Sequence, residues 1–348
     1  MPRPTLADVA RAAGVHPGTA SRALNPDLPD RITAATAKRV REAAQRLGYV
    51  VDSMGRSLRT GRSRTVGVLV PDLTNPVFPG MIRGIEDELR AHDYAALLAN
   101  TDNEVTREAE LIATLKARQC DAFIVASALR DDPVVRELVT AGDRVVLINR
   151  LLDDTTTSAV LSDDQSGVAA AVTHLHDLGH KAIGHLAGPR NLSITQARRD
   201  AYSHSMTSLG LRHPRNYLVH ASAYTAAAGH DAALRLIERS DVTAIVAGND
   251  MLAVGCYTAL EQLGLSCPKD ISVVGYNDMP LAEHLRPALT TVRMPQYDMG
   301  VEAARLIMNI LGASEQVSPE TIFVPTELVL RSSTAPPAAR PRAISQRS

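Results

Sequence analysis

Polar and aromatic side chains follow several of the short runs that we predict as strands. Arg198 offers a fork of hydrogen-bond donors and Asp250 a carboxylate, and such a pair can fix the orientation of a polyhydroxyl ligand. The rings of Phe78 and Tyr224 stand out because the chain has only 3 Phe, 8 Tyr and no Trp. A sugar or a base can stack on such a ring. The predicted ligand-binding residues are Asp72, Asn75, Phe78, Asn149, Arg150, Arg198, Tyr224, Asn249 and Asp250.

No catalytic or metal-binding set accompanies these residues. The histidines between residues 174 and 185 lack the spacing of a tetrahedral metal site, and so do the three cysteines. No nucleophile, base and orienting group recur together, and no glycine-rich phosphate loop follows a strand. The sequence therefore predicts neither an enzyme nor a bound metal or cofactor.

The predicted strands alternate with helical stretches. We place seven strands, at residues 66–70, 95–98, 122–125, 145–148, 183–186, 244–246 and 271–274. This alternation is typical of parallel sheets in a doubly wound arrangement, and seven strands suffice for two sheets. Ligands of open α/β sheets bind beyond the carboxyl ends of the strands. We therefore expect a cleft where the strand ends of two sheets face each other.

The first 25 residues are predicted to form a helix-turn-helix. Apolar residues at positions 6, 9, 10 and 13 lie on one face of a short helix, which Thr5 caps and Gly14 ends. Pro17 suits the first turn of a second helix, continuing to Leu24, because the N–H that proline lacks would have no partner there. A third helix, at residues 31–47 with Thr33 as its cap, completes a small unit. Such a corner can place its second helix in the DNA major groove.

Charge is distributed unevenly along the chain. Residues 1–64 contain 12 Arg and Lys against 5 Asp and Glu, whereas residues 65–333 contain 22 against 33. A basic segment on an acidic body is expected of a nucleic-acid-binding module joined to a second domain. The chain has 348 residues and 45% hydrophobic content, enough for two or three cores. It shows neither a signal peptide nor an apolar run of about 20 residues, so we expect a cytoplasmic protein without a membrane partner.

Several motifs along the chain match one known family. Those near the start are Thr5-Leu6-Ala7-Asp8-Val9-Ala10, Ala13-Gly14-Val15, Thr19-Ala20-Ser21-Arg22-Ala23-Leu24-Asn25, Leu47-Gly48-Tyr49 and Arg56-Ser57-Leu58-Arg59-Thr60-Gly61. The others are Val70-Pro71-Asp72-Leu73-Thr74-Asn75-Pro76, His174-Leu175, Leu178-Gly179-His180, Gly248-Asn249-Asp250 and Leu289-Thr290-Thr291-Val292. With these motifs the chain resembles the LacI/GalR transcriptional regulators over almost its whole length.

The resemblance implies a small all-α helix-turn-helix head and a two-lobed α/β body like that of a periplasmic binding protein, with doubly wound parallel sheets. We expect the head at residues 1–49, a hinge linker with a short helix at 50–62, and an effector-binding and dimerisation domain at 63–333. The N lobe would comprise about residues 63–162 plus 292–322, and the C lobe about 163–291 plus 323–333. The chain would thus cross between lobes near residues 162, 291 and 323. Residues 334–348, rich in Pro, Ala, Arg and Ser, are predicted to be a disordered tail.

The resemblance also implies a set of DNA contacts. Pro17 and Gly18 occupy the two positions at which the family mainly selects its operator, and neither side chain can hydrogen-bond a base. Base recognition would then shift to Arg22, which can form two hydrogen bonds with guanine. His16 replaces the serine usual in the family, which predicts a weaker start of the second helix. The full predicted set is Thr5, Pro17, Gly18, Thr19, Ser21, Arg22, Asn25, Arg56 and Leu58.

In the linker, the resemblance implies that Leu58 of each subunit wedges into the minor groove at the operator centre. The chain departs from the family at Val51-Asp52, where Pro-Asn is usual, and at Gly55, where Ala is usual. Gly55 should weaken the hinge helix by about 1 kcal/mol per chain. Formation of that helix would depend more strongly on DNA.

We therefore expect a homodimeric regulator, most simply a repressor, that binds a palindromic operator and responds to a small carbohydrate-like effector. The nine ligand-binding residues match the family's effector positions, and Arg198 and Asp250 would face each other across the cleft. The main alternative is a solute-binding protein of a sugar transport system, which would need an export signal. A sugar-converting enzyme is a third possibility and lacks a catalytic set. The sequence leaves open whether the effector is a sugar, sugar phosphate, nucleoside or purine, and whether it induces or corepresses.

Overall fold

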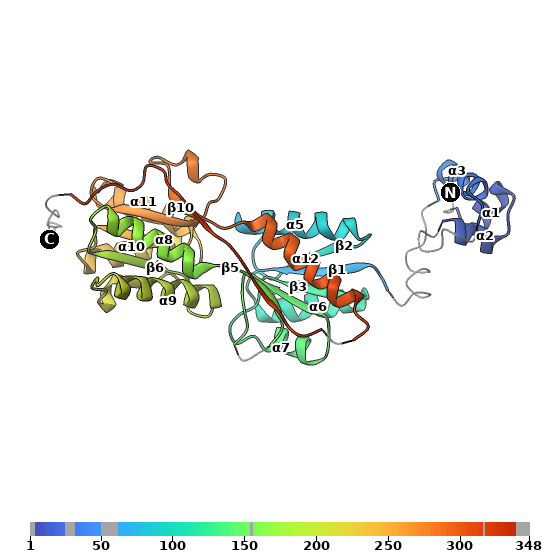
Figure 1. The fold of residues 1–348 in the computed structure, drawn as a ribbon, viewed down its shortest axis with the longest axis horizontal. Coiled ribbons are helices and arrows are strands. Elements are labelled where there is room, and N and C mark those ends of the chain that lie inside the picture. Colours follow the sequence, from blue (N-terminus) through green and yellow to red (C-terminus); the bar gives the residue numbers. More distant parts are fainter. Residues whose placement is uncertain (1–3, 25–31, 50–61, 154–155, 316, 339–348) are drawn as a thin grey trace. The chain divides into compact units, whose positions relative to one another are not determined.

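The computed structural model describes residues 4–24, 32–49, 62–153, 156–315 and 317–338. The chain divides into two compact units, Met1–Ser63 and Arg64–Ser348 (Figure 1). Within the described part of the chain, no helix is long and apolar enough to cross a membrane.

The described residues of the first unit form three helices, and two of them begin at their predicted caps. The helices are α1 (Leu6–Ala13), α2 (Pro17–Ala23) and α3 (Ala34–Leu47). The Thr5 hydroxyl accepts a hydrogen bond from the Asp8 N–H, and the Asp8 carboxylate accepts one from the Thr5 N–H (2.9 Å). Thr33 caps α3, which confirms that cap and starts the helix three residues later than predicted. The helices pack through Val9, Ala10, Ala13, Ala20, Val40, Ala43 and Ala44.

The start of α2 is better capped than the sequence predicts. Nδ1 of His16 accepts a hydrogen bond from the Gly18 N–H at 3.2 Å, so the imidazole takes the place of a hydroxyl cap. Replacement of serine by His16 therefore does not leave this backbone donor without a partner.

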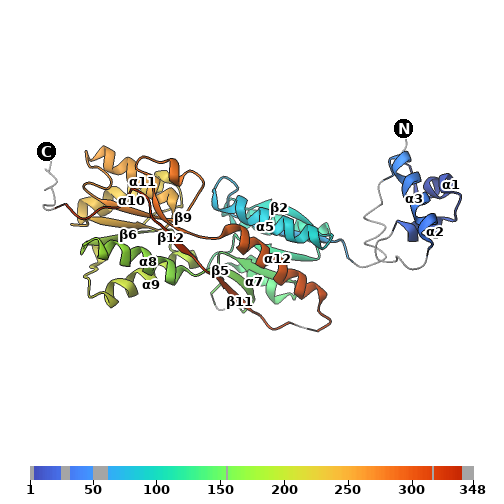
Figure 2. The ribbon, with the colours of Figure 1, turned by 45° about the horizontal axis from the view of Figure 1, so that its top comes forward.

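Two six-stranded sheets form the body, one in each lobe (Figures 1 and 2). The N-lobe sheet has the order β11 (Thr321–Val324), β5 (Ser158–Ser162), β4 (Val145–Ile148), β3 (Ala122–Val125), β1 (Thr65–Val70) and β2 (Ala95–Asn100). The C-lobe sheet has the order β12 (Glu327–Val329), β10 (Thr290–Arg293), β9 (Ser272–Asn277), β8 (Ala244–Ala247), β6 (Ile183–Ala187) and β7 (Leu218–His220). All neighbouring strands are parallel except β10 and β12. The predicted doubly wound fold is confirmed, with one antiparallel edge strand in the C lobe.

Helices cover both faces of each sheet (Figures 1 and 2). The N lobe contains α5 (Val77–Ala91), α6 (Val105–Ala117), α7 (Pro133–Thr140) and α12 (Gln296–Gly312). The C lobe contains α8 (Asp164–Asp177), α9 (Ser193–Ser208), α10 (Ala226–Arg239), α11 (Asp250–Gln262) and the short 3₁₀ helices η2 (Arg215–Tyr217) and η3 (Ala282–His284).

The chain crosses between the lobes after β5, after β10 and between β11 and β12. Two predicted boundaries need correction. Phe323 and Val324 pair with β5, so they belong to the N lobe and the last crossing follows Val324. Val292 and Arg293 pair with β9, so the second crossing follows Arg293. Strand pairing decides these boundaries, which the family resemblance implied only approximately.

The predicted disordered tail begins too early. Thr334 Oγ1 lies 3.0 Å from His174 Nε2, and the Ala335 carbonyl accepts a hydrogen bond from His180 Nε2 at 2.9 Å. The Ala335 N–H donates to Ser272 Oγ at 3.1 Å. Residues 334 and 335 are therefore fixed by partners far away in the sequence, which composition does not reveal. Residues 339–348 lie outside the described part of the chain.

Candidate functional site

Two cavities that share lining residues lie beyond the carboxyl ends of strands from both lobes. The larger has a volume of about 330 Å³ and the smaller about 20 Å³. Eight of the nine predicted ligand-binding residues line at least one of them: Asp72, Asn75, Phe78, Asn149, Arg150, Arg198, Tyr224 and Asn249. The structure thus brings together residues separated by up to 177 positions in the sequence.

Two larger hollows elsewhere do not gather these residues. One, of about 800 Å³, lies on the C lobe along α10 and contains none of the nine. The other, of about 720 Å³, lies beside the crossing from β5 to α8 and contains only Asn149 among them. Size alone therefore does not locate the candidate site, whereas convergence of polar side chains at the strand ends does.

The N-lobe side of the site comes from the segments after β1 and β4. Asn75 precedes α5, and its side-chain oxygen accepts a hydrogen bond from the Val77 N–H at 3.2 Å. Phe78, in the first turn of α5, is buried and lines both cavities. Asn149 and Arg150 follow β4 directly and are also buried.

Arg198 is held in the C lobe by three contacts. Its Nε lies 3.0 Å from the carboxylate of Asp164, a second guanidinium nitrogen donates to the Gly248 carbonyl at 2.7 Å, and the group lies 3.7 Å from the ring centre of Tyr276. Burial lowers the pKa of Arg198, but the charge and hydrogen bond of Asp164, together with Tyr276 and Tyr224, outweigh this and hold the pKa above its ordinary value. Arg198 is therefore a charged donor whose buried charge is compensated.

Tyr224 lies in the loop before α10 and lines both cavities. Its hydroxyl lies 3.0 Å from Thr195 Oγ1. A Cβ at Gly188 would lie 2.2 Å from the Tyr224 ring, so only glycine admits the ring in this position. Asn249 caps α11 by accepting a hydrogen bond from the Leu252 N–H at 2.9 Å.

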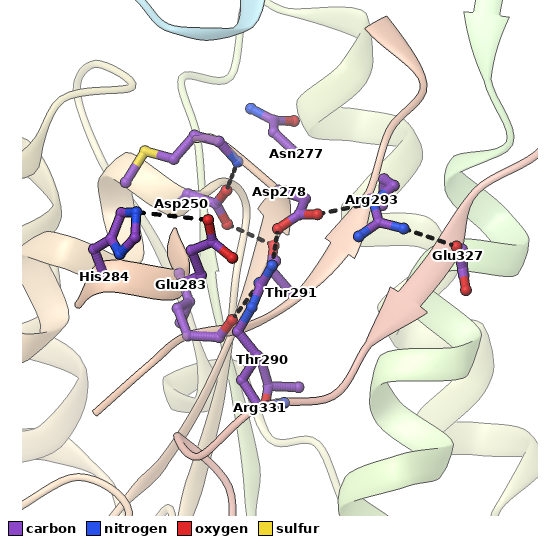
Figure 3. Close-up of polar contacts among 12 residues, drawn as sticks. Asp250, Asn277, Asp278, Glu283, His284, Thr290, Thr291, Arg293, Glu327 and Arg331 are labelled. Carbon is purple, nitrogen blue, oxygen red and sulfur yellow. Dashed lines mark hydrogen bonds and ion pairs between the residues drawn. The ribbon is translucent and has the colours of Figure 1, made fainter. Parts of the chain in front are cut away.

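Asp250 does not fit its predicted role. It is 1% exposed and lines neither cavity, and its carboxylate accepts hydrogen bonds from the Met279 N–H at 2.7 Å and from Thr291 Oγ1 at 2.6 Å (Figure 3). Burial raises the pKa of Asp250 to about 7. Arg198 and Asp250 both belong to the C lobe, so the expectation that they face each other across the cleft is wrong. Asp250 instead links the loop after β9, through Met279, to β10, through Thr291.

Asn277 is a site residue that the sequence analysis missed. It ends β9, has a φ of 113°, lines the smaller cavity, and its side-chain oxygen is buried without a hydrogen-bond partner among the described residues. Its backbone carbonyl accepts a hydrogen bond from Gln296 of the N lobe at 2.6 Å. We predicted that this strand ends at residue 274, and the error of three residues hid a polar side chain at the carboxyl end.

The next residue, Asp278, joins the segments that cross between lobes (Figure 3). Its carboxylate lies 2.9 Å from Arg293 at the end of β10 and 2.7 Å from Arg331 beyond β12. Arg293 also lies 3.2 Å from Glu327 of β12. The loop that presents Asn277 to the cavity is thus tied to two crossing segments.

In the head, five predicted DNA contacts lie on α2: Pro17, Gly18, Thr19, Ser21 and Arg22. Pro17 and Arg22 are exposed, and Arg22 Nε donates to the Gly18 carbonyl at 3.0 Å. Thr5 is occupied by capping α1. Asn25, Arg56 and Leu58 lie outside the described residues.

In the part of the chain that the structure describes, no three His, Cys, Asp or Glu side chains gather to hold a metal ion. A helix-turn-helix unit joined to a two-lobed α/β body defines the class of regulators with a DNA-binding head and a ligand-binding domain of periplasmic-binding-protein type. Residues 5–52 match the bacterial regulatory proteins of the lacI family, and residues 172–334 match the periplasmic binding protein-like domain.

Similar proteins extend this match to nearly the whole chain. The HTH-type transcriptional repressor CytR of Escherichia coli is 30% identical over 332 residues, which cover 95% of this chain and 96% of that protein. The HTH-type transcriptional regulator MalR of Streptomyces coelicolor is 36% identical over 338 residues, with coverage of 95% and 96%. The solved complex of transcriptional regulator CelR with cellobiose has a TM-score of 0.72 at 29% identity, covering 95% of this chain and 100% of that one. The chain belongs to the lacI family of bacterial regulatory proteins.

Proposed function

We propose that the protein is a cytoplasmic transcriptional repressor that binds a palindromic operator as a homodimer and whose operator affinity is controlled by a small carbohydrate-like effector. The convergence of eight predicted residues from both lobes on the shared cavities carries this proposal. Similarity to CytR supports repression, and similarity to the CelR–cellobiose complex supports a carbohydrate effector.

A ligand in these cavities would touch both lobes and so favour one degree of closure over another. Asn75 and Arg150 would contact it from the N lobe, and Arg198 and Asn249 from the C lobe. The three segments that cross between the lobes would act as the hinge of this closure. Closure would thus move the N lobe, which is continuous with the linker, relative to the C lobe. The ligand shifts operator affinity only through its different affinity for the two states. The coupling is reciprocal, so an effector that weakens operator binding tenfold binds the operator complex tenfold more weakly, or about 1.4 kcal/mol.

DNA binding tests the first half of the proposal. The full chain should shift a fragment from its own upstream region, with an affinity that falls steeply with salt because Arg and Lys contacts release phosphate counterions. A matched fragment beginning at Thr65 should remain folded and dimeric but should no longer bind the DNA. Retention of operator affinity by that fragment would contradict the assignment of the first unit to DNA binding.

Effector binding tests the second half. A thermal-shift screen of sugars, sugar derivatives and nucleosides should yield a ligand that raises Tm, since saturation at about 100 times Kd adds about 2.7 kcal/mol of stability. The same ligand should change operator affinity. A solute-binding protein would bind the ligand without binding DNA, and a sugar-converting enzyme would consume it.

A further inference from the structure

Arg150 is a buried guanidinium whose protein partners are neutral. The residue is 5% exposed, and one terminal nitrogen donates to the Ser127 carbonyl at 3.0 Å and to the Asn103 side-chain oxygen at 3.2 Å. Its Nε is buried without a hydrogen-bond partner among the described residues. Within the same part of the chain, no carboxylate lies within 4.0 Å of the Arg150 guanidinium.

The two buried arginines of the site differ in this respect. Arg198 has the carboxylate of Asp164 at 3.0 Å, whereas Arg150 has none, although both line the smaller cavity. A buried charge without a counter-ion is costly, and a ligand that supplies the counter-ion removes that cost. The cavity wall thus presents one compensated and one uncompensated positive charge.

The buried carboxyl group of Glu108 acts on the charge of Arg150 but does not form an ion pair with it among the described residues. Glu108 on α6 accepts a hydrogen bond from the Ser127 hydroxyl. Burial raises the pKa of Glu108 to about 8, and the negative charge of Asp132 adds to this effect. Burial lowers the pKa of Arg150 to about 10. Burial therefore favours the protonated, neutral form of Glu108, although the positive charge of Arg150 acts in the opposite direction.

The acids that line the larger cavity have partners of their own. Asp102 forms an ion pair with Arg107 at 2.6 Å. Asp72 is partly exposed and accepts hydrogen bonds from the backbone and hydroxyl of Thr74 at 2.8 and 2.7 Å. Neither lies within ion-pair distance of Arg150, whose planar fork matches a carboxylate or a phosphate.

We propose that the effector carries an anionic group that pairs with Arg150, so that the ligand is a sugar acid or a sugar phosphate and not a neutral sugar. The inference rests on the proposed function, because it takes these cavities as the effector site.

Calorimetric and thermal-shift titrations of the full chain with matched ligands test it. Suitable sets are glucose, gluconate and glucose 6-phosphate, or ribose, ribonate and ribose 5-phosphate, and the two anions in each set separate carboxylate from phosphate recognition. We expect an anionic member to bind at least about tenfold more tightly than its neutral parent. That preference should fall below about twofold in Arg150→Gln. Inorganic phosphate alone should raise Tm more in the wild type than in this variant.

The outcomes separate this inference from the proposed function. A neutral sugar that binds as tightly as its anionic derivatives, or a preference that persists in Arg150→Gln, overturns the anionic ligand and leaves the carbohydrate effector in place. If no sugar derivative binds but phosphate still discriminates between the two proteins, the anion site stands and the carbohydrate effector falls. If no sugar derivative binds and phosphate does not discriminate between the two proteins, the anion site and the carbohydrate effector are both wrong.

Two further variants control for structure. Arg150→Met removes the charge but keeps much of the length of the side chain. Both Arg150→Gln and Arg150→Met should lose the anion preference, so the second variant keeps the test valid if the other folds poorly. Glu108→Gln resembles the protonated acid and can still accept from Ser127, so its anion affinity should lie within about twofold of the wild type. An increase of tenfold or more would show that Glu108 is ionised and compensates Arg150, which would overturn the argument.

Discussion

Asn149 and Asn277 occupy equivalent positions in the two lobes. Asn149 follows β4 and Asn277 ends β9, and each of these is the third strand in its sheet order. Both residues have positive φ, 67° and 113°, both are buried, and both line the smaller cavity. Their neighbours differ in charge: Arg150 follows in the N lobe and Asp278 in the C lobe. The same corner of each lobe therefore contributes one amide to a shared cavity.

This symmetry predicts that removal of either amide weakens effector binding without changing operator affinity. Asn149→Gly and Asn277→Gly delete the side chain while glycine tolerates the positive φ, so they avoid the strain that alanine would add. Each should weaken effector binding about fivefold, the equivalent of one hydrogen bond of about 1 kcal/mol. Calorimetry with the effector found by screening measures this loss.

Asn216→Gly serves as the control, because Asn216 is exposed and its amide donates to the Arg239 carbonyl, away from both cavities. Operator affinity without effector should be the same in all three variants. Unchanged effector affinity in Asn149→Gly and Asn277→Gly would remove both residues from the site.

The ion pair of Arg198 and Asp164 predicts strong coupling between these residues. Arg198→Gln alone leaves the buried Asp164 carboxylate without its counter-ion and should cost roughly 3–5 kcal/mol of stability. Asp164→Asn in the same chain should recover a large part of this loss. Arg150→Gln, which leaves no carboxylate behind, should lower stability far less.

Denaturant unfolding of the single and double variants measures this double-mutant cycle. Additive effects of Arg198→Gln and Asp164→Asn would mean that the 3.0 Å contact contributes no coupling.

The raised pKa of Glu108 predicts that the free energy of unfolding of the body decreases as pH rises. Its folded pKa of about 8 lies above the ordinary value of 4.5, so between these values the folded protein holds a proton that the unfolded chain has released. The contribution is complete below the lower value and is lost as pH rises toward the upper one, at a slope of up to about 1.4 kcal/mol per pH unit. Asp250, whose pKa is also raised by burial, acts in the same direction.

Tm of the wild type and of Glu108→Gln, measured at about pH 5.5 and about pH 8, tests this dependence. The decrease in Tm should be smaller in the variant, because glutamine has no proton to lose, while the contribution of Asp250 remains. Equal decreases would contradict the raised pKa of Glu108.

The residues at strand ends show which parts of the site the sequence predicts. The apolar runs at 122–125 and 145–148 coincide with β3 and β4, and Asn149 and Arg150 were placed correctly at the end of the second. β9 continues to Asn277 through Gly275 and Tyr276, which interrupt the β-branched pattern, and its last polar residue was missed. β11 and β12 are short, with four and three residues, and were not predicted, although β11 contains the apolar run Ile322-Phe323-Val324. β5, β7 and β10 were not predicted either.

Side-chain partners from distant segments were beyond sequence reasoning. Asn249 follows the predicted strand at residues 244–246, but the direction of the Asp250 carboxylate is set by Thr291 and Met279. In the same way, the contrast between Arg150 and Arg198 depends on whether a carboxylate from another helix reaches the guanidinium. Local periodicity identifies the residues at the strand ends and not the ion pairs among them.

The last prediction concerns Leu58, whose role as a minor-groove wedge comes from the family resemblance and which lies outside the described residues. A wedge contributes only where the duplex is kinked, so Leu58→Ala should weaken operator binding by roughly 1–3 kcal/mol, about fivefold to 150-fold, and random DNA binding by less than about twofold. Fluorescence anisotropy with operator and scrambled duplexes measures both, with Ser57→Ala as the control in the same linker. Operators with a central pyrimidine–purine step should show the largest loss, because such a step unstacks easily. Equal weakening on both duplexes would show that Leu58 acts through folding or packing and not through the kink.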